Sequence, residues 1–582
     1  MSCIRAVLSC PERPGIPVKT QGRLLVLPLA LAMAFLAALG SVGQAQNLEK
    51  LDLHKPVTVS GSAGLNLGFY TAFGAPTRKD PFQWLANANL TFKVLNMVTI
   101  PFSANFSQQN QSFMQPFNQY GASPKYKWVT GHLGYRNLTF SQLGLAGHTF
   151  LGAGVEMNPG KWRIGACYGR FRRAVSLEEA NANGVDISFR RMGYAAKVGY
   201  GTTSDYIDLT MLKAWDALSS VKINSDSLEA VTPEENLVWT VAGKKTIAKK
   251  LVVEGEYGRT AITRDTRALT IQSGTPYDGL GSFFTPRAST IYRGAFLGGI
   301  GYTGGSYSVK LAYKRIAPDY RTLGAYFFNN DMEELTANLS KTLFKGKVSF
   351  TGSGGAQRNN LAGELATNTA RVVGAANISA VLTPTWNVSL QGSNFSSFLR
   401  VEQDVLSDSL NFYQVSRNLG GGITHLMGTD DVRHTVNLMV AYQVANARKE
   451  YSVDFDDQTK FYNVNLSYNM NQKPKGLTVG LNYTTGLNMT PDGQILNTGP
   501  VLVASKTFKD KKIKAGLSSS YLMVFMNGTP SSAVFNNKMK VDLNLWKHHG
   551  LGFTSAFLRR GATSTAPGFS EYQFNAAYTF RF

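Results

Sequence analysis

The residue types that carry most enzyme chemistry are present in the sequence, but they are not arranged for it. The seven histidines are His54, His132, His148, His425, His434, His548 and His549. No pair of them has the spacing of a zinc site, and none lies beside a Ser or Cys in a nucleophile motif. The sequence therefore predicts that the protein is not an enzyme and that it holds no metal and no cofactor.

Short acidic runs are the next candidates for a binding role. Asp454-Phe455-Asp456-Asp457 and Asp430-Asp431 carry the oxygen ligands that divalent cations favour, but their spacing does not match a calcium loop. Solvated acidic loops explain them better. Gly-rich runs such as Gly298-Gly299-Ile300-Gly301 are not followed by Lys and Ser or Thr, so they do not form phosphate-binding loops.

A period of two dominates the rest of the chain. Tyr462, Val464 and Leu466 fall on one parity, and Asn463 and Asn465 on the other. This alternation predicts strands with one apolar and one polar face. It recurs at 307–314, 477–484 and 538–545. Aromatic residues make up 11% and charged residues 16%, and the mean hydropathy is −0.13, which is typical of strands whose inner residues dilute the apolar ones.

The last strand, 571–582, is the most specific motif. Its even positions are Tyr572, Phe574, Ala576, Tyr578, Phe580 and Phe582, while its odd positions are mostly polar. A strand that ends in Phe with one aromatic face resembles the final strand of Gram-negative outer-membrane β-barrels. The resemblance implies that Tyr578, Phe580 and Phe582 form the signal read by the barrel assembly machinery.

The N-terminal region agrees with export. A basic leader precedes the apolar run 24–39, and Gly43-Gln44-Ala45 offers a small-residue cleavage site. We expect residues 1–45 to be a secretory signal peptide and residues 46–582 to be the barrel. Cys3 and Cys10 then leave with the leader, and Cys167 remains without a disulfide partner.

The connections between the expected strands alternate between short, turn-rich links and longer loops. This order predicts an all-β fold, a single large antiparallel transmembrane barrel of about 24 strands (about 22 to 26). Residues 108–146 interrupt the order. As one excursion after the third strand, they predict an infolded loop that constricts the lumen with Trp128, His132, Tyr135 and Arg136. Two alternatives remain open: this segment caps the outer mouth, or it adds a pair of strands.

Charge is strongly positive, with a formal net charge of +22. We expect no nucleic-acid partner, because export separates the protein from the nucleic acid of its cell and its basic residues are scattered. An electropositive lumen, or loops that bind lipopolysaccharide phosphates, explains the positive net charge better. The expected pore-lining residues are Lys161, Arg163, Asp208, Glu254, Glu256, Lys310, Lys314, Lys538 and Lys540.

The architecture resembles porins and related channels of the bacterial outer membrane. The basic, Gly- and Asn-rich character and the segment Ala317-Pro318-Asp319-Tyr320-Arg321 are similar to large Bacteroidota barrels. The leading hypothesis is an integral outer-membrane channel for passive or gated passage of solutes, with a weak preference for anions. The alternatives are the barrel of a secretion or surface-assembly complex, which has a protein partner, and a surface receptor or adhesin. The expected surroundings are outer-membrane lipid and lipopolysaccharide.

Overall fold

The computed structural model describes residues 56–108, 118–221, 231–326, 328–365, 367–401, 412–449, 457–508, 512–563 and 566–582. The predicted leader, residues 1–45, and the acidic run 454–456 lie outside the described residues. Among the described residues, no helix is long and apolar enough to cross a membrane.

The strands follow one another along the whole described chain. They are β1 (Val57–Phe73), β2 (Phe82–Val94), β3 (Val98–Ser107), β4 (Gln119–Ala122), β5 (Lys125–Tyr126), β6 (Val129–Thr139), β7 (Ala146–Met157), β8 (Trp162–Arg172), β9 (Arg190–Gly201), β10 (Tyr206–Ala217), β11 (Glu235–Ile247), β12 (Leu251–Thr263), β13 (Thr290–Thr303), β14 (Tyr307–Ile316), β15 (Met332–Leu343), β16 (Val348–Arg358), β17 (Thr367–Val381), β18 (Trp386–Val401), β19 (Phe412–Gly428), β20 (Val432–Lys449), β21 (Asp457–Gln472), β22 (Leu477–Thr490), β23 (Gly493–Phe508), β24 (Ile513–Met526), β25 (Thr529–Trp546), β26 (His549–Arg560) and β27 (Phe569–Arg581). The short helices are α2 (Leu177–Asn183) and the 3₁₀ segments η4 (Leu218–Ser220), η6 (Pro276–Phe283) and η7 (Phe344–Gly346).

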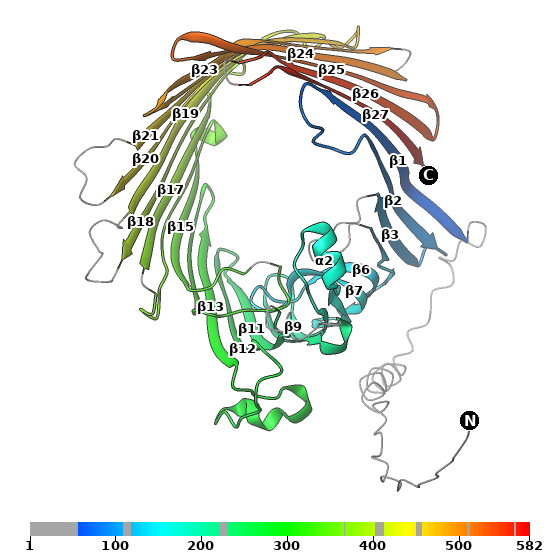
Figure 1. Ribbon diagram of the computed structural model, residues 1–582, viewed down its shortest axis with the longest axis vertical. Helices are drawn as coiled ribbons and strands as arrows, with labels where there is room; N and C mark the ends of the chain where they lie inside the picture. The colour runs from blue at the N-terminus through cyan, green and yellow to red at the C-terminus, as the bar shows by residue number, and fades with distance from the viewer. Residues whose placement is uncertain are drawn as a thin grey trace, which may run out of the picture. The chain divides into compact units, whose positions relative to one another are not determined.

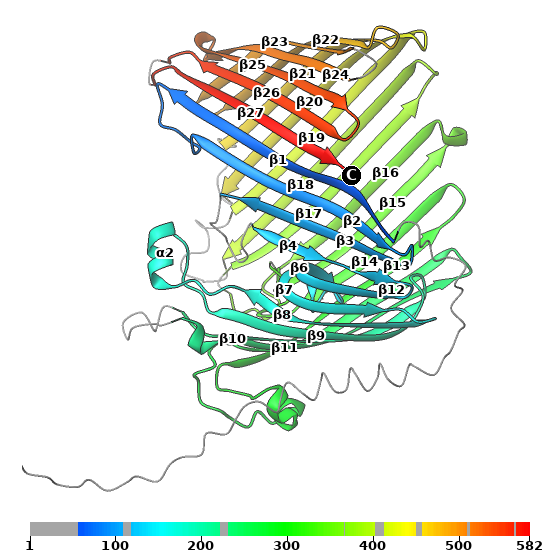
Figure 2. The ribbon, with the colours of Figure 1, turned by 90° about the vertical axis from the view of Figure 1, so that its right-hand side faces the viewer.

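The sheet closes on itself into a barrel (Figures 1 and 2). Each strand pairs antiparallel with the next, and β1 pairs with β27 from Ser62↔Arg581 to Phe73↔Ser570. β4 and β5 share one place in the wall, because both pair with β3 on one side and β6 on the other. The described residues therefore form a wall of 26 strands, within the predicted range.

The interpretation of 108–146 as a single excursion is corrected by this pairing. Residues 119–126 and 129–139 are wall strands, which is the strand-pair alternative that the sequence left open, and they account for the two strands beyond about 24. The part of this range that enters the lumen is 140–145, between β6 and β7. Residues 109–117 lie outside the described residues.

One end of the barrel carries short turns and the other carries most of the long connections, as the alternation predicted. β1 begins and β27 ends at the turn end, because their termini pair with each other there. At the loop end the links 491–492 and 527–528 are as short as turns. Asn527 and Gly528 have φ of 50° and 81°, so they fit the two-residue hairpin that Asn-Gly favours.

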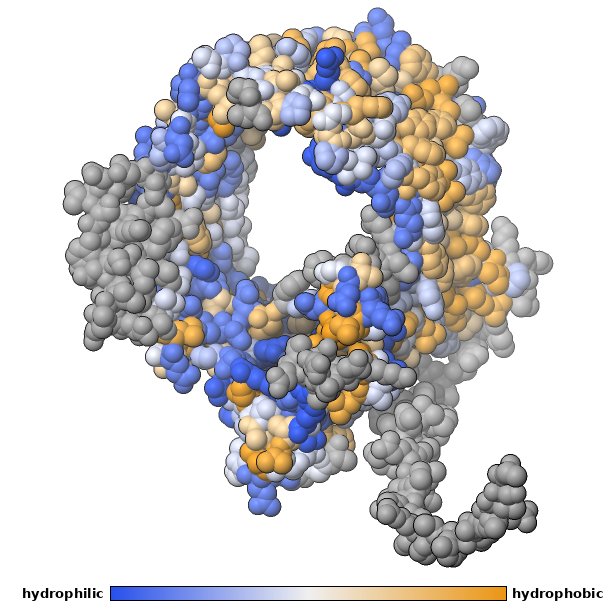
Figure 3. Space-filling model, viewed as in Figure 1, coloured by the Kyte–Doolittle hydropathy of each residue, from blue (hydrophilic) through white to orange (hydrophobic). Residues whose placement is uncertain are grey.

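The two faces of the wall differ in chemistry. Apolar side chains of one parity, such as Leu311, Leu466 and Leu481, are exposed on the outer face. Figure 3 shows apolar residues gathered over the outer surface near β1, β2 and β3, and hydrophilic residues around much of the central opening. The alternation read from the sequence therefore predicts which face each strand presents.

The loop 264–289 covers part of the outer face at the loop end. It contains η6, which Figure 1 shows outside the wall beside β11 and β12. Tyr277 and Phe284 pack on Leu237 and Ala261 of the outer face. The ammonium of Lys213 lies 5.0 Å from the ring centre of Phe284. The loop thus shields the ion pair of Lys213 with Glu235 from the surroundings of the barrel.

Candidate functional site

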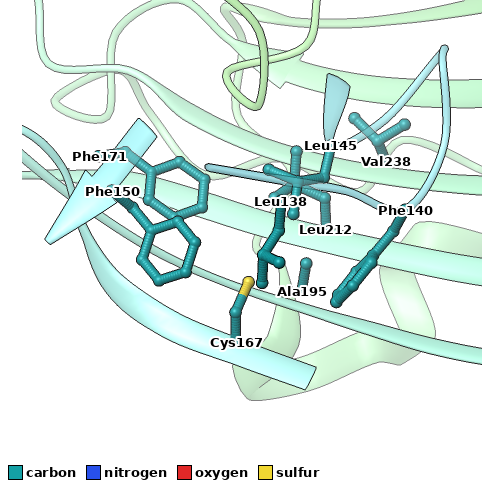
Figure 4. Close-up of a cluster of buried hydrophobic side chains, with 9 residues drawn as sticks. All are labelled: Leu138, Phe140, Leu145, Phe150, Cys167, Phe171, Ala195, Leu212 and Val238. Atoms are coloured by element: carbon teal, nitrogen blue, oxygen red, sulfur yellow. The ribbon is translucent and has the colours of Figure 1, made fainter. Parts of the chain in front are cut away.

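The inner face from β6 to β15 carries an apolar core, which is unusual for the inside of a large barrel. Leu138, Phe150 and Phe171 come from wall strands and point inward, together with Cys167, Ala195, Leu212 and Val238. Phe140 and Leu145, from the link between β6 and β7, complete the cluster, as Figure 4 shows. Apolar side chains on the inner face are kept from water only because something covers them.

The first cover is the segment 140–145, held down by Glu256 of β12. The Glu256 carboxylate accepts the Ser141 hydroxyl at 2.5 Å and the backbone N–H groups of Gln142 and Leu143 at 3.2 and 2.8 Å. Glu256 is only 8% exposed. Charge-assisted hydrogen bonds of this kind are stronger than neutral ones, so Glu256 fixes the segment against the wall.

The second cover is the loop 317–331, between β14 and β15. The Tyr320 hydroxyl donates to the Leu143 carbonyl at 2.9 Å, and the Thr322 hydroxyl donates to the Gly144 carbonyl at 2.8 Å. Asn236 of β11, which is fully buried, accepts the Leu323 N–H at 3.0 Å. Burial raises the pKa of Tyr320 far above its ordinary value. We call 140–145 and 317–331 together the infolded loops.

A chain of ion pairs extends from the wall to the second loop. Asp216 of β10 pairs with Arg172 at 3.1 Å and with Arg191 at 2.8 Å. Arg191 also pairs with Glu234 at 2.8 Å, and Glu234 pairs with Arg321 of the loop at 2.7 Å. The side chain of Asp216 is fully buried. Because each buried charge has a partner, the chain fastens the loop without leaving a lone charge in the core.

A glycine makes the closest part of this packing possible. A Cβ at Gly258 of β12 would lie 2.7 Å from the Tyr320 hydroxyl and 3.0 Å from the Leu143 Cβ. Any other residue would therefore push both infolded loops away from the wall.

By strand register, eight of the nine expected pore-lining residues lie on the inner face, and many of them are paired, whereas Lys161 stands in the turn between β7 and β8. Arg163 donates two hydrogen bonds to Asp208, at 2.8 and 2.9 Å. Lys310 pairs with Glu254 at 2.6 Å. Glu256 lies beneath the infolded loops, and Lys540 pairs with Asp542 at 2.9 Å. No ion pair with a described residue is formed by Lys161, Lys314 or Lys538.

The four expected constriction residues separate between the two faces of the wall. His132 and Arg136 lie on the inner face of β6, where His132 contacts Glu156 at 3.1 Å and Arg136 donates to Ser103 at 3.0 Å. Tyr135 lies on the outer parity and packs edge-on against Tyr120, and Trp128 stands in an exposed turn. The reading that all four meet inside the lumen is therefore corrected, because 129–139 is a strand of period two.

The residues that fasten the infolded loops were not predicted as a group. A signal was present in the sequence, since β10 and β11 carry Leu212, Ala214 and Val238 on the parity that is polar in other strands. A strand that is apolar on both faces is buried on both. That pattern indicates a covered inner wall at β10 and β11.

The opposite inner wall is polar, and from β15 to β21 the groove that crosses it is lined by uncharged residues. The whole groove, of about 960 Å³, extends from β11 to β21. Amide and hydroxyl side chains dominate its lining there, among them Asn338, Ser353, Asn377, Gln391, Asn418 and Asn463. No group of three or more His, Cys, Asp or Glu residues that is arranged to hold a metal occurs in the described part of the chain.

The terminal strand closes the wall. Tyr578, Phe580 and Phe582 share the outer parity of β27, and the Phe582 N–H donates to the Gly61 carbonyl of β1 at 3.0 Å. A closed barrel leaves no unpaired strand edge for the hydrocarbon to meet. With its apolar exterior, the protein is an integral β-barrel of the bacterial outer membrane. The turn end is then periplasmic and the loop end extracellular.

No model of a known protein family matches the sequence, and no curated protein matches it. Among solved structures, the chain is similar to Acinetobacter baumannii OccAB4, with 13% identity and a TM-score of 0.29 over 65% of this chain and 99% of that one. The chain is also similar to Pseudomonas aeruginosa OccK9 (OpdG), with 10% identity and a TM-score of 0.28 over 60% of this chain and 92% of that one. The FrpB iron transporter from Neisseria meningitidis (F3-3 variant) is 11% identical to this chain, with a TM-score of 0.38 over 92% of this chain and 82% of that one.

Proposed function

We propose that the protein is an outer-membrane channel for small polar solutes, passive or gated by its infolded loops, with a weak preference for anions. The observation that carries the proposal is the opening through the barrel beside these loops, which Figure 3 shows framed largely by hydrophilic residues. A lumen of this kind provides an aqueous route across the apolar layer.

The preference for anions is supported by the balance of paired and unpaired charge. Asp208 and Glu254 are neutralised by Arg163 and Lys310, whereas Lys538 has no ion pair within the described residues, and Lys314 lies opposite Glu334 in the strand register without a direct ion pair. Unpaired ammonium groups raise the local concentration of anions.

The infolded loops support the gating part of the proposal. Hydrogen bonds and ion pairs fasten them to the wall at Glu256, Asn236 and Glu234. The first of these contacts involves a segment of only six residues, 140–145, between two long strands. Such a segment is able to leave the wall without unpairing β6 or β7.

Planar-bilayer recording of the purified full-length protein tests the channel. Stable single-channel conductance is the expected result, and a heat-denatured sample serves as the control. A folded barrel that is silent and co-purifies with a protein partner would contradict a channel and favour the secretion or surface-assembly alternative. A silent barrel that binds an external ligand through its loops would favour a receptor or adhesin.

The export and assembly signals are a further part of the proposal. Residues 1–45 act as the signal peptide, and Tyr578, Phe580 and Phe582 are read by the barrel assembly machinery. The aromatic outer face of β27 supports the second role. Removal of Phe582 should lower the amount of heat-modifiable barrel in the outer membrane, whereas Arg581→Gln should leave it unchanged. Equal amounts of barrel for both variants and the wild type would argue against the signal.

A further inference from the structure

Lysines are concentrated at the periplasmic end of the barrel. Exposed lysines stand in short turns that are spread around the whole wall, namely Lys127, Lys161, Lys249, Lys345, Lys475 and Lys547. We call these six the lysine ring. They occupy turns that follow β5, β7, β11, β15, β21 and β25. The ring therefore runs around the circumference rather than along one side.

None of these six ammonium groups pairs with an acidic residue in the described part of the chain. The ion pairs near this end, such as Lys245 with Asp205, Arg433 with Asp430 and Arg163 with Asp208, use other cations. The extracellular end differs, because its cations are mostly arginines beside carboxylates, as in Arg264 with Asp319 and Arg358 with Glu333. Exposed arginines without an ion pair also occur at the extracellular end, as at Arg559 and Arg560, but the described lysines that stand unpaired in turns gather at the periplasmic end.

Large aromatic side chains adjoin the lysine ring along the chain. Trp128 follows Lys127, Trp162 follows Lys161, and Trp546 precedes Lys547. Trp162 and Trp546 are 51% and 60% exposed, and Trp162 lies on the outer parity of β8. Tryptophan prefers the headgroup level of a bilayer. The ammonium groups beside these rings therefore lie at the depth of lipid phosphates, which long lysine side chains reach by snorkelling.

We propose that the lysine ring binds the phosphate groups of anionic glycerophospholipids in the periplasmic leaflet of the outer membrane. Charge complementarity supports this occupant, because a basic juxtamembrane segment attracts anionic headgroups. The distribution of the six lysines around the wall supports lipid over a protein partner. A single docked protein would contact lysines on one arc of the wall, whereas lipid surrounds the whole barrel. This inference does not depend on the proposed channel function.

Quenching of tryptophan fluorescence by brominated lipids tests the proposal on the full-length protein. The barrel is reconstituted into phosphatidylcholine bilayers that contain a fixed fraction of either brominated phosphatidylglycerol or brominated phosphatidylcholine. We expect phosphatidylglycerol to be enriched several-fold at the protein surface. The enrichment should fall as salt is raised, because exposed charges are screened over about 10 Å at 0.1 M. Inorganic phosphate at the same ionic strength should displace no more lipid than chloride does.

Two variants that remove the same amount of positive charge test whether the lipid enrichment depends on the lysine ring. The quadruple change of Lys161, Lys249, Lys345 and Lys547 to Gln should abolish the enrichment. The same change at the inner-face lysines Lys310, Lys314, Lys538 and Lys540 should leave it intact. Equal quenching by both lipids in the wild type, equal loss in both variants, or selective displacement by inorganic phosphate would each overturn the proposal. If the ring variant does not fold, the salt dependence of the wild type decides.

Discussion

At the scale of single residues, Glu256 controls the first infolded loop. It is the shared acceptor for Ser141, Gln142 and Leu143, and hydrogen bonds to a charged group contribute about 1.5–3 kcal/mol each. Glu256→Ala should therefore raise the ratio of detached to attached segment 140–145 by at least tenfold. The measurement is maleimide labelling of Cys167, which is buried beneath the loop and should react much faster in the variant.

Glu254→Ala is the matched control for this prediction. Glu254 lies two residues away on the same face of β12, but it pairs with Lys310 and contacts neither infolded loop in the described contacts. Its removal should leave Cys167 labelling slow. Fast labelling in both variants would mean that the wall itself loosens, and slow labelling in both would contradict the anchoring role of Glu256.

Gly258 gives a second prediction, based on space rather than charge. Gly258→Ala places a methyl group 2.7 Å from the Tyr320 hydroxyl, so both infolded loops must shift. Overpacking of this kind typically costs about 1–3 kcal/mol. We expect a lower thermal midpoint and faster labelling of Cys167. Gly255→Ala, where the nearest atom to the new Cβ is 3.4 Å away, should change neither.

The residue roles show where sequence reasoning stops. Period two is a local property, so it predicts that Arg163 and Asp208 share the inner parity with Lys310. It does not predict that Arg163 meets Asp208 across β8, β9 and β10, because that contact depends on the register of neighbouring strands. The contact of Glu256 with 140–145 joins residues more than a hundred positions apart. No local pattern contains such a contact.

At the scale of elements, the two faces of β21 give a third prediction. Leu466 is exposed on the outer face between Leu438 and Tyr483, whereas Asn465 faces the lumen. Leu466→Arg should cost about 2–4 kcal/mol near the middle of the membrane and impair assembly, while Asn465→Arg should be tolerated. The check is the fraction of heat-modifiable barrel in isolated outer membranes. Equal tolerance of both changes would refute the assignment of faces.

The loop 264–289 gives a prediction about pH. Asp278 accepts the Ser273 hydroxyl and N–H groups of Ser273 and Gly274, which lowers its pKa, and Arg267 lowers the pKa of Asp265. A lowered pKa means that these contacts stabilise the loop above the ordinary carboxylate range, near pH 4, and are lost as pH falls through the lowered values.

Hydrogen exchange in 264–289 measures this effect. After correction for the intrinsic rate, exchange should be unchanged between pH 8 and about pH 5 and should accelerate below about pH 4. Asp278→Asn should accelerate it already at neutral pH, because a neutral amide binds these donors more weakly. An Asp278→Asn loop that exchanges like the wild type at neutral pH would contradict the argument.

The elements also show why the count of strands differed by two. Residues 119–126 form a wall strand in two pieces, interrupted at Ser123-Pro124, and the pieces are only four and two residues long. Pro has no N–H to donate, so the break in the ladder hides the strand from a periodicity analysis. Without this partner, a strand at 129–139 breaks the alternation of turns and loops.

At the scale of the whole molecule, the barrel has two unlike inner walls. From β6 to β15 the wall is covered by the infolded loops, and the apolar clusters behind them are closed to water. From β15 to β21 it is open and lined by amides and hydroxyls. A passing solute therefore meets a neutral surface on one side and charged groups near the edges of the covered region. The net selectivity depends on the few charges without partners.

That balance gives the last prediction, a weak preference for anions. Lys314 and Lys538 lie on the inner face without an ion pair in the described residues, whereas Asp208, Glu254 and Asp542 are paired with cations. The reversal potential across a salt gradient at low ionic strength should show anion preference, and it should fade near 1 M salt, where the screening length is about 3 Å. Replacing Lys314 and Lys538 by Gln should move the reversal potential toward zero, while Lys213→Gln, beneath the outer loop 264–289, should not. Cation preference at low salt, or an unchanged potential in the double variant, would show that other groups set the selectivity.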